Sequence, residues 1–404
     1  MADIVVFGGD GYIGWPLALE LATSRPRAKV LIVDNYLTRR HADGLGAGSL
    51  LPIRPLPERI AAYREVFGLD NLSHVELDSA DPDQMTAFMA SIRPEVIYHL
   101  AHQRAAPYSM LGLKECIETV TNNEVGFLNL IWLVKEHHPD CHIVKLGSFG
   151  AYAKAGLDIP EGNAVMSCGG KTSAAPMPFP RASDDFYHIT KINDGNFAGL
   201  AARKWGLRIT DVMQSTVFGA MTERTMTDER LHTRFDYDEV LGTVLNRFCV
   251  QALAGLPLTV YGLGTQTSGI MTLEHCIGAL VSLADAPCAP GSHRIINNCP
   301  KVYAINELAE MVRLEGNRLG LNVRVSRNRY NPRFEDGVAH DYSVETRYLA
   351  TLPEPLPMRL AIARSLEVLA EQRDAIRVSC VEPKHDWIGG AAQEEPGSFA
   401  ARGA

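Results

Sequence analysis

The sequence Ile4-Val5-Val6-Phe7-Gly8-Gly9-Asp10-Gly11-Tyr12-Ile13-Gly14 begins with four apolar residues and continues into a glycine-rich loop. A short apolar run that ends in glycines is typical of a buried strand in a parallel sheet. Residues 15–23 have the pattern of a helix, and residues 30–33 form a second buried strand that ends in Asp34. Strand, helix and strand together predict one βαβ unit.

The glycines at positions 8, 11 and 14 lie directly after a strand and directly before a helix. Glycine permits a tight turn and lets a pyrophosphate approach the backbone, while the helix N-terminus attracts its negative charge. Asp34 follows the last of these glycines by 20 residues, where a carboxylate can accept hydrogen bonds from ribose hydroxyls. The motif predicts a dinucleotide site. Asp34 favours NAD over NADP because it repels a 2′-phosphate, although Arg39 and Arg40 follow closely and weaken that preference.

The expected cofactor contacts come from this loop, from the ends of later strands and from one later helix. They are Gly8, Gly11, Tyr12, Ile13, Gly14, Asp34, Asn35, Arg39, Asp78, Leu100, Asn123, Tyr187 and Lys191. Asp78 follows the third predicted strand, where we expect it near the adenine, but the position suits a turn acid or a helix N-cap equally well.

Further strands are predicted at residues 74–77, 96–100, 142–146 and 208–213, the first three each after a helix-length amphipathic stretch. Parallel strands with crossover helices form a doubly wound sheet, so the predicted class is α/β, a Rossmann sheet with a smaller C-terminal α/β substrate domain. We expect residues 1–210 to form the NAD-binding domain and residues 211–390 the substrate domain, some of whose segments return to the first. Residues 391–404, with little to bury, are expected to be a flexible tail.

Composition excludes several classes of protein. The 404 residues carry 39 Lys and Arg against 47 Asp and Glu, a net charge of −8, which gives no general attraction to nucleic acid or an anionic membrane. No apolar run approaches the roughly 18 residues of a membrane span and no leader pattern is present, so we expect a cytoplasmic protein without nucleic-acid or membrane partners. Eight cysteines without metal-like spacing are expected to be buried thiols, and no metal is predicted.

Tyr187 and Lys191 are four residues apart and therefore share one face of a predicted helix. A lysine ammonium lowers the pKa of a nearby phenol, which can then take the proton of a sugar or alcohol hydroxyl while a hydride leaves for a nicotinamide. Ser148 follows the strand at residues 142–146 and can hydrogen-bond the same hydroxyl from the carboxyl edge of the sheet. A Tyr/Lys pair alone is common on protein surfaces. A catalytic role for this pair is favoured because the glycine loop, the serine and the Tyr/Lys pair follow one another in this order along the chain.

These three features in this order resemble the extended short-chain dehydrogenase/reductase family, also called the NAD-dependent epimerase/dehydratase family. His99-Leu100-Ala101 and Asn122-Asn123-Glu124-Val125-Gly126 fit the fourth strand and the following helix of that family. The resemblance implies NAD in the N-terminal domain, a nucleotide-diphosphate sugar in the C-terminal domain, and a homodimer or higher homo-oligomer.

A closer resemblance, to the UDP-sulfoquinovose synthase branch of that family, covers almost the whole chain. It is carried by residues 8–14, Gln103-Arg104-Ala105-Ala106-Pro107-Tyr108-Ser109-Met110, Val144-Lys145-Leu146-Gly147, Phe186-Tyr187-His188, Leu245-Asn246-Arg247-Phe248-Cys249-Val250-Gln251, Pro257-Leu258-Thr259-Val260-Tyr261-Gly262 and Asn331-Pro332-Arg333. It implies a tightly held NAD that oxidises carbon 4 of UDP-glucose, addition of sulfite at carbon 6, and return of the hydride.

The departures from that branch fall in the catalytic region. Ala151 replaces a glutamate, His102 stands where the branch has a glutamate, and Ser268 replaces an arginine expected to bind the diphosphate. The sugar 4,6-dehydratases of the wider family carry an Asp-Glu pair after the catalytic hydroxyl. Here those positions are Phe149 and Gly150, which cannot move a proton, so a standard dehydration is disfavoured.

The redox residues remain while the carboxylates are missing, so the preferred hypothesis is an NAD-dependent epimerase or isomerase of a nucleotide sugar. The expected catalytic residues are Ser148, Tyr187, Lys191 and His102. The expected substrate contacts are Gln103, Arg104, Tyr108, Phe149, Gln214, Arg247 and Arg333. His102 is a candidate base because its ordinary pKa is about 6.5, but a buried histidine satisfied by a neighbouring group is the commoner case.

Three alternatives stay open. The chain is a UDP-sulfoquinovose synthase that tolerates the replacements, an NDP-sugar dehydratase, or a non-catalytic NAD-sensing protein on the same fold. The residues leave open the nucleotide base, the sugar and the altered carbon.

Overall fold

The computed structural model describes residues 3–46, 48–152, 157–328 and 343–381. Its centre is a sheet of seven parallel strands in the order β14-β10-β5-β4-β1-β2-β3. These strands are β1 (Ile4–Phe7), β2 (Val30–Asp34), β3 (Leu72–Glu76), β4 (Val96–His99), β5 (His142–Leu146), β10 (Arg208–Gln214) and β14 (His293–Asn298). The predicted doubly wound sheet is confirmed, and its six predicted strands have ends within two residues of those expected; β14 was not predicted.

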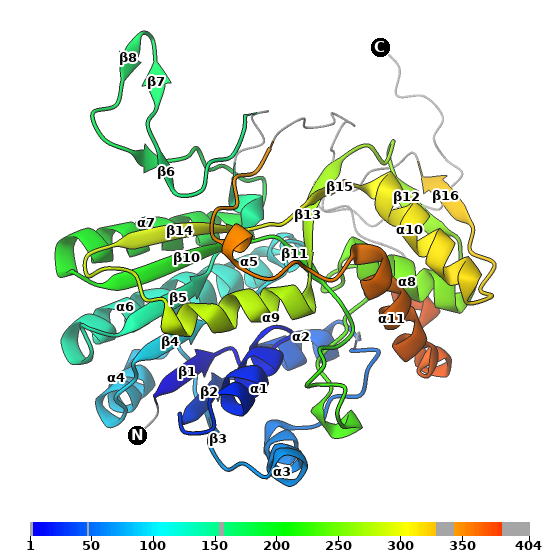
Figure 1. Cartoon of the computed structure of the whole chain (residues 1–404), viewed down its shortest axis with the longest axis horizontal. Coiled ribbons are helices and arrows are strands. Elements are labelled where there is room, and N and C mark those ends of the chain that lie inside the picture. The colour runs from blue at the N-terminus through cyan, green and yellow to red at the C-terminus, as the bar shows by residue number, and fades with distance from the viewer. Residues whose placement is uncertain (1–2, 47, 153–156, 329–342, 382–404) are drawn as a thin grey trace.

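Helices cover both faces of the sheet (Figure 1). One face packs against α1 (Gly14–Ser24), α3 (Leu56–Phe67) and α9 (Leu273–Ser282). The other packs against α4 (Pro82–Ser91), α6 (Gly126–His137) and α7 (Phe186–Trp205). Along β1, Ile4 and Val6 face the first set of helices and Val5 and Phe7 face the second, because side chains alternate along a strand. This double burial explains why the strands are continuous apolar runs in the sequence.

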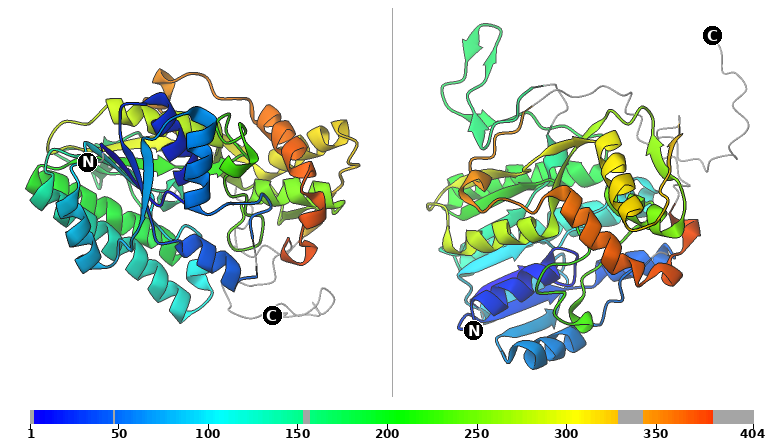
Figure 2. Two further views of the ribbon diagram at one scale, coloured as in Figure 1. Left: turned by 90° about the horizontal axis from the view of Figure 1, so that it is seen from below. Right: turned by 45° about the vertical axis from the view of Figure 1, so that its right-hand side comes forward.

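A smaller unit lies at one side of the sheet, where Figure 2 shows its yellow and orange helices together. Its core joins α8 (Val244–Ala254), α10 (Ile305–Arg318) and α11 (Met358–Ala370). Beside them are the sheets β11-β13-β15 (Thr216–Phe218, Thr267–Thr272 and Val302–Ala304) and β12-β16 (Leu258–Tyr261 and Val325–Asn328).

The chain passes between the two units more than once. The expected boundary at residue 210 falls inside β10, which continues to Gln214. After the chain has built α8 and α9, β14 returns to the central sheet and pairs in parallel with β10 along its length. The expected tail at residues 391–404 lies outside the described residues.

Short elements complete the chain. The helices α2 (Leu37–Gly44) and α5 (Leu113–Val120) lie near the carboxyl edge of the sheet, and a π-helical turn at Thr121–Val125 joins α5 to α6. An arm between β5 and α7 contains β6 (Asn163–Ala164) paired with β9 (Met177–Pro178), and β7 (Ser167–Cys168) paired with β8 (Lys171–Thr172). Figure 1 shows the β7–β8 hairpin projecting away from the body.

All eight cysteines fall within the described ranges and are free thiols. The expectation that they are buried is wrong for three of them: Cys168 is exposed in the β7–β8 hairpin, and Cys116 and Cys380 are only partly covered. Each of these three lies on a hairpin or a short surface helix, where spacing in the sequence carries no information on burial.

Candidate active site

A cleft of about 760 Å³ opens where the carboxyl ends of the parallel strands face the smaller unit. The loops after β1, β2, β4 and β5 all end at this edge because the strands run in the same direction. Most of the predicted site residues line the cleft. They are Gly8, Gly11, Tyr12, Ile13, Gly14, Asp34, Asn35, Leu100, His102, Arg104, Ser148, Phe149, Tyr187, Lys191, Gln214 and Arg247.

The glycine loop has no room for side chains. Gly8 has a φ of +80°, and a Cβ on it would lie 2.6 Å from the carbonyl carbon of Leu100. A Cβ on Gly14 would lie 2.0 Å from the carbonyl oxygen of Gly8, so helix α1 can begin close against β1 only with glycine here. The loop therefore presents bare backbone and the first N–H groups of α1 to the cleft, which is the arrangement that a dinucleotide pyrophosphate needs.

Asp34, the last residue of β2, faces the same loop. Its carboxylate accepts hydrogen bonds from the backbone N–H groups of Asp10 at 2.8 Å and Tyr36 at 2.7 Å. Burial and then the nearby Asp10 carboxylate raise the pKa of Asp34 to about 6, although the two N–H groups act in the opposite direction. The side chain of Asn35 caps the turn that follows by accepting from the N–H of Leu37. A carboxylate held in this way is placed to accept ribose hydroxyls.

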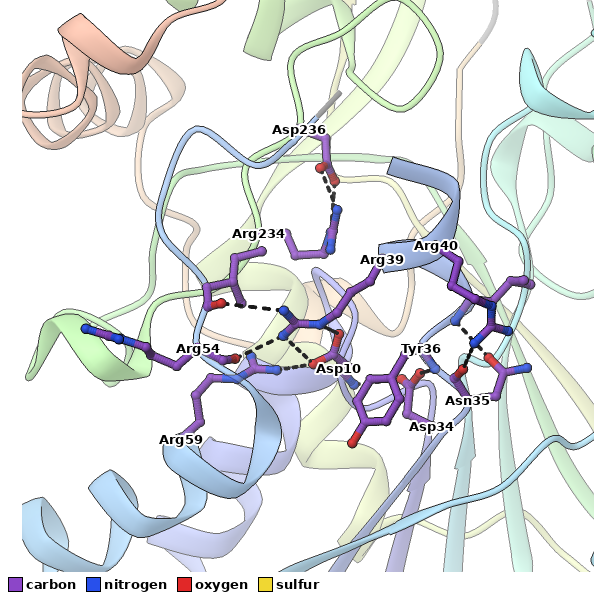
Figure 3. Close-up of polar contacts among 12 residues, drawn as sticks. Asp10, Asp34, Asn35, Tyr36, Arg39, Arg40, Arg54, Arg59, Arg234 and Asp236 are labelled. Atoms are coloured by element: carbon purple, nitrogen blue, oxygen red, sulfur yellow. Dashed lines mark hydrogen bonds and ion pairs between the residues drawn. The ribbon is translucent and has the colours of Figure 1, made fainter. Parts of the chain in front are cut away.

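Arg39 does not line the cleft; its guanidinium lies against Asp10 (Figure 3). Its Nε and Nη2 donate to the two oxygens of Asp10 at 2.7 and 2.8 Å, and Nη2 also donates to the carbonyl of Arg54 at 2.9 Å. The fully buried Arg59 contacts Oδ1 of the same carboxylate, the oxygen that also accepts from Nη2 of Arg39. The expected contact between Arg39 and the cofactor is thus replaced by an ion pair within the protein.

Two other predicted cofactor residues also lie off the cleft. Asp78 borders a neighbouring, more open cavity, and its Oδ1 accepts from the N–H of Ala80, which is the turn role that its position equally suited. Asn123 is completely buried in the π-helical turn. Its amide donates to the carbonyl of Gln103 and to the hydroxyl of Thr190, so it ties the loop after β4 to α7.

Tyr187 and Lys191 lie on α7 with the Lys191 Nζ 5.6 Å from the centroid of the Tyr187 ring. Ser148 follows β5, and its hydroxyl accepts from the N–H of Gly150 at 3.2 Å. Burial is the largest influence and raises the pKa of Tyr187, whereas Arg104 and a hydrogen bond with Ser148 lower it. Burial and then Lys145 lower the pKa of Lys191 to about 7. The three side chains are therefore brought together as predicted from the sequence, in a site that disfavours charge.

His102 contacts its neighbours through both ring nitrogens, unlike a free base. Lys191 Nζ donates to its Nδ1 at 2.7 Å, and its Nε2 lies 3.1 Å from Oδ2 of Asp194. Burial, and then Lys191, lower the pKa of His102 well below the usual value. If the Lys191 ammonium is the donor to Nδ1, the proton of a neutral ring is assigned to Nε2, on the side of Asp194. The geometry is that of a buried histidine satisfied by its neighbours, the commoner of the two cases expected for His102.

Two predicted substrate residues point into the protein. The amide of Gln103 bonds to Ala105 and to the hydroxyl of Thr119. The ring of Tyr108 stacks on His41 at 4.0 Å, and its hydroxyl donates to Glu118 at 2.5 Å. Both therefore shape the loop after β4 and neither lines the cleft. Their neighbour Met110 lines it in their place.

The remaining predicted substrate residues lie along the cleft wall. Arg104 donates to the carbonyl of Leu241 at 3.1 Å and contacts the Asp236 carboxylate. The guanidinium of Arg247 lies 5.3 Å over the ring of Tyr261. The amide oxygen of Gln214 accepts from Asn298 on β14 at 2.7 Å. Arg333 lies outside the described residues.

Sequence reasoning missed His188 and Asp185, which also line the cleft. Asp185 is the N-cap of α7 and accepts from the N–H of His188 at 2.8 Å, and its other oxygen lies 2.7 Å from His188 Nδ1. Burial acts to raise the pKa of Asp185, but the hydrogen bond and charge of His188 outweigh it and lower the pKa. A carboxylate that orients an imidazole is a recurring acid–base arrangement. The spacing Asp-x-x-His at a helix start was the available signal.

Gly150 explains how the imidazole of His188 fits into the cleft. A Cβ on Gly150 would lie 2.4 Å from Nε2 of His188. The glycine therefore makes room for the ring nitrogen that is not bound to Asp185. His188 stands directly after Tyr187 on α7, and the two rings are 4.7 Å apart.

These features define a class of protein. Residues 4–297 match the model of the NAD dependent epimerase/dehydratase family, and the chain belongs to that family. NAD is the cofactor of the family, and the glycine loop and Asp34 fit it: a Cβ at Gly8 or Gly14 would fill the backbone cradle.

Among curated proteins, the chain is 40% identical over 350 residues to a UDP-sulfoquinovose synthase from Sulfolobus acidocaldarius, covering 86% of this chain and 87% of that one. It is 36% identical to the chloroplastic UDP-sulfoquinovose synthase of Spinacia oleracea, covering 95% of this chain and 79% of the relative.

Solved structures share the fold at lower identity. A UDP-glucose 4-epimerase from Thermotoga maritima has a TM-score of 0.64 at 18% identity, covering 91% of this chain and 99% of that one. A UDP-glucuronic acid 4-epimerase from Bacillus cereus has a TM-score of 0.63 at 17% identity, covering 92% and 99%. Within the described parts of this chain, no helix is long and apolar enough to cross a membrane. The same ranges hold no group of three His, Cys, Asp or Glu side chains that could bind a metal ion.

Proposed function

We propose that the enzyme oxidises carbon 4 of a UDP-hexose and later returns the hydride, so that NAD is regenerated in each turnover. The observation that carries the proposal is the convergence of Ser148, Tyr187 and Lys191 on one wall of a cleft whose other end is the glycine loop. NAD, when bound, supplies the hydride acceptor. Gly8, Gly11, Gly14 and Asp34 hold it.

The side chains supply the proton chemistry. Tyr187 takes the proton of the sugar hydroxyl, while the Ser148 hydroxyl hydrogen-bonds the same oxygen. The Lys191 ammonium stabilises the phenolate, and its position is fixed by the carbonyl of Leu146 at 2.7 Å as well as by His102. On the return step Tyr187 gives the proton back. A ketone at carbon 4 also makes the neighbouring C–H bonds more acidic.

For the net reaction, epimerisation or isomerisation of the nucleotide sugar is the first candidate. The His188–Asp185 pair supports inversion or isomerisation at a carbon beside the transient ketone, because an oriented imidazole next to the Tyr187 ring can remove and return a proton there. The Phe149 side chain and the bare backbone of Gly150 supply only shape at the same wall.

The second candidate is UDP-sulfoquinovose synthesis, in which the 4-keto sugar loses the carbon 5 proton and the carbon 6 hydroxyl as water, and sulfite then adds at carbon 6 of the unsaturated ketone. It is favoured by the two curated relatives at 36% and 40% identity, both of which carry that name. Dehydration to a 4-keto-6-deoxy sugar is less favoured, because Phe149 and Gly150 stand where the dehydratases carry their acid pair, although His188 lies beside Gly150.

One experiment distinguishes the candidates. UDP-glucose is incubated in D₂O with the purified enzyme, with and without sulfite, and the products are analysed by NMR and mass spectrometry. Inversion at carbon 4 leaves the mass unchanged, proton exchange beside the ketone adds deuterium, and a sulfonated sugar nucleotide supports the second candidate. Accumulation of NADH in step with product would contradict the hydride cycle itself. UDP-, GDP- and dTDP-hexoses are screened in the same way. If all of them remain unchanged, the hydride cycle is contradicted and a non-catalytic NAD-binding protein is favoured.

We also propose that the protein forms a homo-oligomer through α5, α6 and α7. The continuous helix of α5 and α6 carries a stripe of exposed apolar side chains, among them Leu113 at 77% and Ile117 at 55% exposure. Leu128 and Trp132 continue the stripe at helical spacing. The neighbouring α7 exposes Ile189, so two packed helices present apolar surface together. Such a surface is a frequent site of self-association.

A further inference from the structure

Asp10 is the one charged residue inside the glycine loop at residues 8–14, and the proposed reaction does not use it. Its side chain is 3% exposed; Arg39 donates to both carboxylate oxygens and Arg59 shares Oδ1 with it, as Figure 3 shows. Arg59 is fully buried, with its guanidinium 4.3 Å over the Trp15 ring. A carboxylate that binds two guanidinium groups so close to the cofactor cradle needs a reason beyond the turn itself.

The reason lies in what Arg39 would otherwise bind. An arginine that follows the acid at the end of the second strand is well placed to donate hydrogen bonds to a ribose 2′-phosphate. Here Nε and Nη2 of Arg39 both donate to Asp10, and Nη2 and Nη1 also reach the carbonyls of Arg54 and Ile53. Its fork of donors is therefore used within the protein. We propose that Asp10 determines cofactor specificity: its two-point ion pair keeps Arg39 away from a 2′-phosphate, so that the cleft accepts NAD and rejects NADP.

The surrounding charges agree with this role. Asp10 and Asp34 oppose Arg39 and Arg59, so the four side chains sum to zero and offer no excess positive charge to a phosphate dianion. Arg40, the next cation along the chain, keeps its charge, and its Nη1 is used in a hydrogen bond to the carbonyl of Asn35. Arg54, at the other end of Arg39, pairs with Glu58 on the surface.

Asp10 also couples the two acids. Its own N–H donates to Asp34 Oδ2 at 2.8 Å, so one residue both orients the ribose-binding carboxylate and removes the competing cation. Asp34 alone would repel a 2′-phosphate, but it would leave Arg39 free to compensate for that repulsion. Asp34 repels the 2′-phosphate and Asp10 prevents Arg39 from binding it, so both acids act against NADP.

The test compares the dissociation constants of NAD⁺ and NADP⁺ by titration calorimetry on the full chain, after copurified nucleotide has been removed. It needs no sugar substrate, so its failure is separate from failure of the proposed reaction. Asp10→Ser is combined with Arg59→Met throughout, because Asp10→Ser alone leaves a buried guanidinium without its carboxylate. Arg59→Met alone is the matched control, and NAD⁺ affinity within about threefold of wild type shows that the site is intact.

With Asp34→Ser alone, we expect NADP⁺ affinity to rise by no more than about threefold, because Arg39 is still held. Adding Asp10→Ser and Arg59→Met to Asp34→Ser releases Arg39, and we expect NADP⁺ affinity to rise by about a further tenfold. Adding Arg39→Leu removes this second gain. A full gain from Asp34→Ser alone, or a second gain that survives Arg39→Leu, overturns the proposal.

Arg39→Leu in the otherwise unchanged protein tests the same point if the multiple variants do not fold. The proposal expects the ratio of the two dissociation constants to stay within about threefold of wild type, because Arg39 contributes to neither complex. A selective loss of NADP⁺ affinity of about tenfold would show that Arg39 already reaches the phosphate, and the proposal would be wrong.

Discussion

Lys191 donates a hydrogen bond to His102 Nδ1 at 2.7 Å, and the far nitrogen of the same ring lies 3.1 Å from the Asp194 carboxylate. Burial raises the pKa of Asp194 to about 7, while Lys145 and Lys191 act against that rise. Lys191, beside Tyr187, is thus hydrogen-bonded to a buried imidazole, and that imidazole in turn contacts a buried carboxylate. Its orientation depends on a contact between the loop after β4 and helix α7.

This relationship predicts different effects for two substitutions of His102. His102→Asn keeps an acceptor for Lys191 and should retain the rate of sugar oxidation within about tenfold, whereas His102→Leu should lower it by about 10²-fold through misplacement of the ammonium. The rate is read from NADH absorbance in a single turnover with UDP-glucose. His138→Asn, at a buried histidine that bonds to the carbonyl of Met89 away from the cleft, is the matched control and should leave the rate unchanged. Equal losses in the Asn and Leu variants would indicate that the imidazole itself moves the proton.

Tyr187→Phe should lower the rate of hydride transfer by at least about 10³-fold, because it removes the group proposed to take the proton of the sugar hydroxyl. NAD binding, measured by native mass spectrometry, should be retained. Tyr98→Phe is the matched control, since the Tyr98 hydroxyl bonds to the carbonyl of Leu280 away from the cleft. Turnover that survives Tyr187→Phe would remove the central step of the proposed reaction.

Gly150→Ala should displace the His188 ring, because the added methyl carbon would lie 2.4 Å from Nε2. We expect turnover to fall by about tenfold or more while NAD binding persists, since a displaced acid–base group loses its alignment. Gly278→Ala, on α9, adds the same methyl group where no heavy atom lies within 4 Å, and should be silent. If both variants turn over UDP-glucose at the wild-type rate, His188 has no part in the chemistry.

Asp34 predicts a pH dependence of stability in the cofactor-free protein. Its folded pKa of about 6 lies above the unfolded value of about 3.9, so its contribution favours folding fully below the unfolded value and is lost as the pH rises through about 6. As the pH rises from about 4 to about 7, the free energy of unfolding of Asp34→Asn should increase relative to that of the wild type by up to about 3 kcal/mol. Urea titrations across this range measure the difference. A difference that does not change with pH would show that Asp34 is solvated.

Ile117→Glu should lower the molecular mass measured by light scattering, if the stripe on α5 and α6 forms the interface between copies. A charge in the middle of an apolar interface is costly to bury. Leu319→Glu introduces the same charge at another exposed apolar residue, at the end of α10, and should not change the mass. Equal masses for wild type and Ile117→Glu would place the interface elsewhere.

The parts of the structure that local sequence determines were predictable. The strand Ile4–Phe7 and the acid at the end of β2 follow from apolar runs and glycine spacing, and the structure has them where expected. Ser148, Tyr187 and Lys191 share the cleft because β5 and α7 bring them to the same edge. Each of these features depends only on neighbours along the chain and on the direction of parallel strands.

The failures concern the direction in which polar side chains point. Gln103 and Tyr108 belong to the same loop as Arg104, yet their contacts with Thr119 and Glu118 on α5 turn them inward. Residue type does not distinguish these orientations, because each needs a partner from another element. The sequence likewise predicted Arg39 to face the cofactor, because its ion-pair partner Asp10 lies 29 residues earlier in the chain and could not be foreseen.

The return of β14 to the central sheet has a consequence for synthesis of the protein on the ribosome. The edge strand of the Rossmann half becomes available only when translation has passed Asn298, after α8 and α9 have already emerged. Until then β10 presents an unpaired edge that can attract other nascent strands. Expressing residues 1–210 alone would remove most of β10 as well as β14, so the cofactor half is not a module that can be separated from the rest by a single cut at that position.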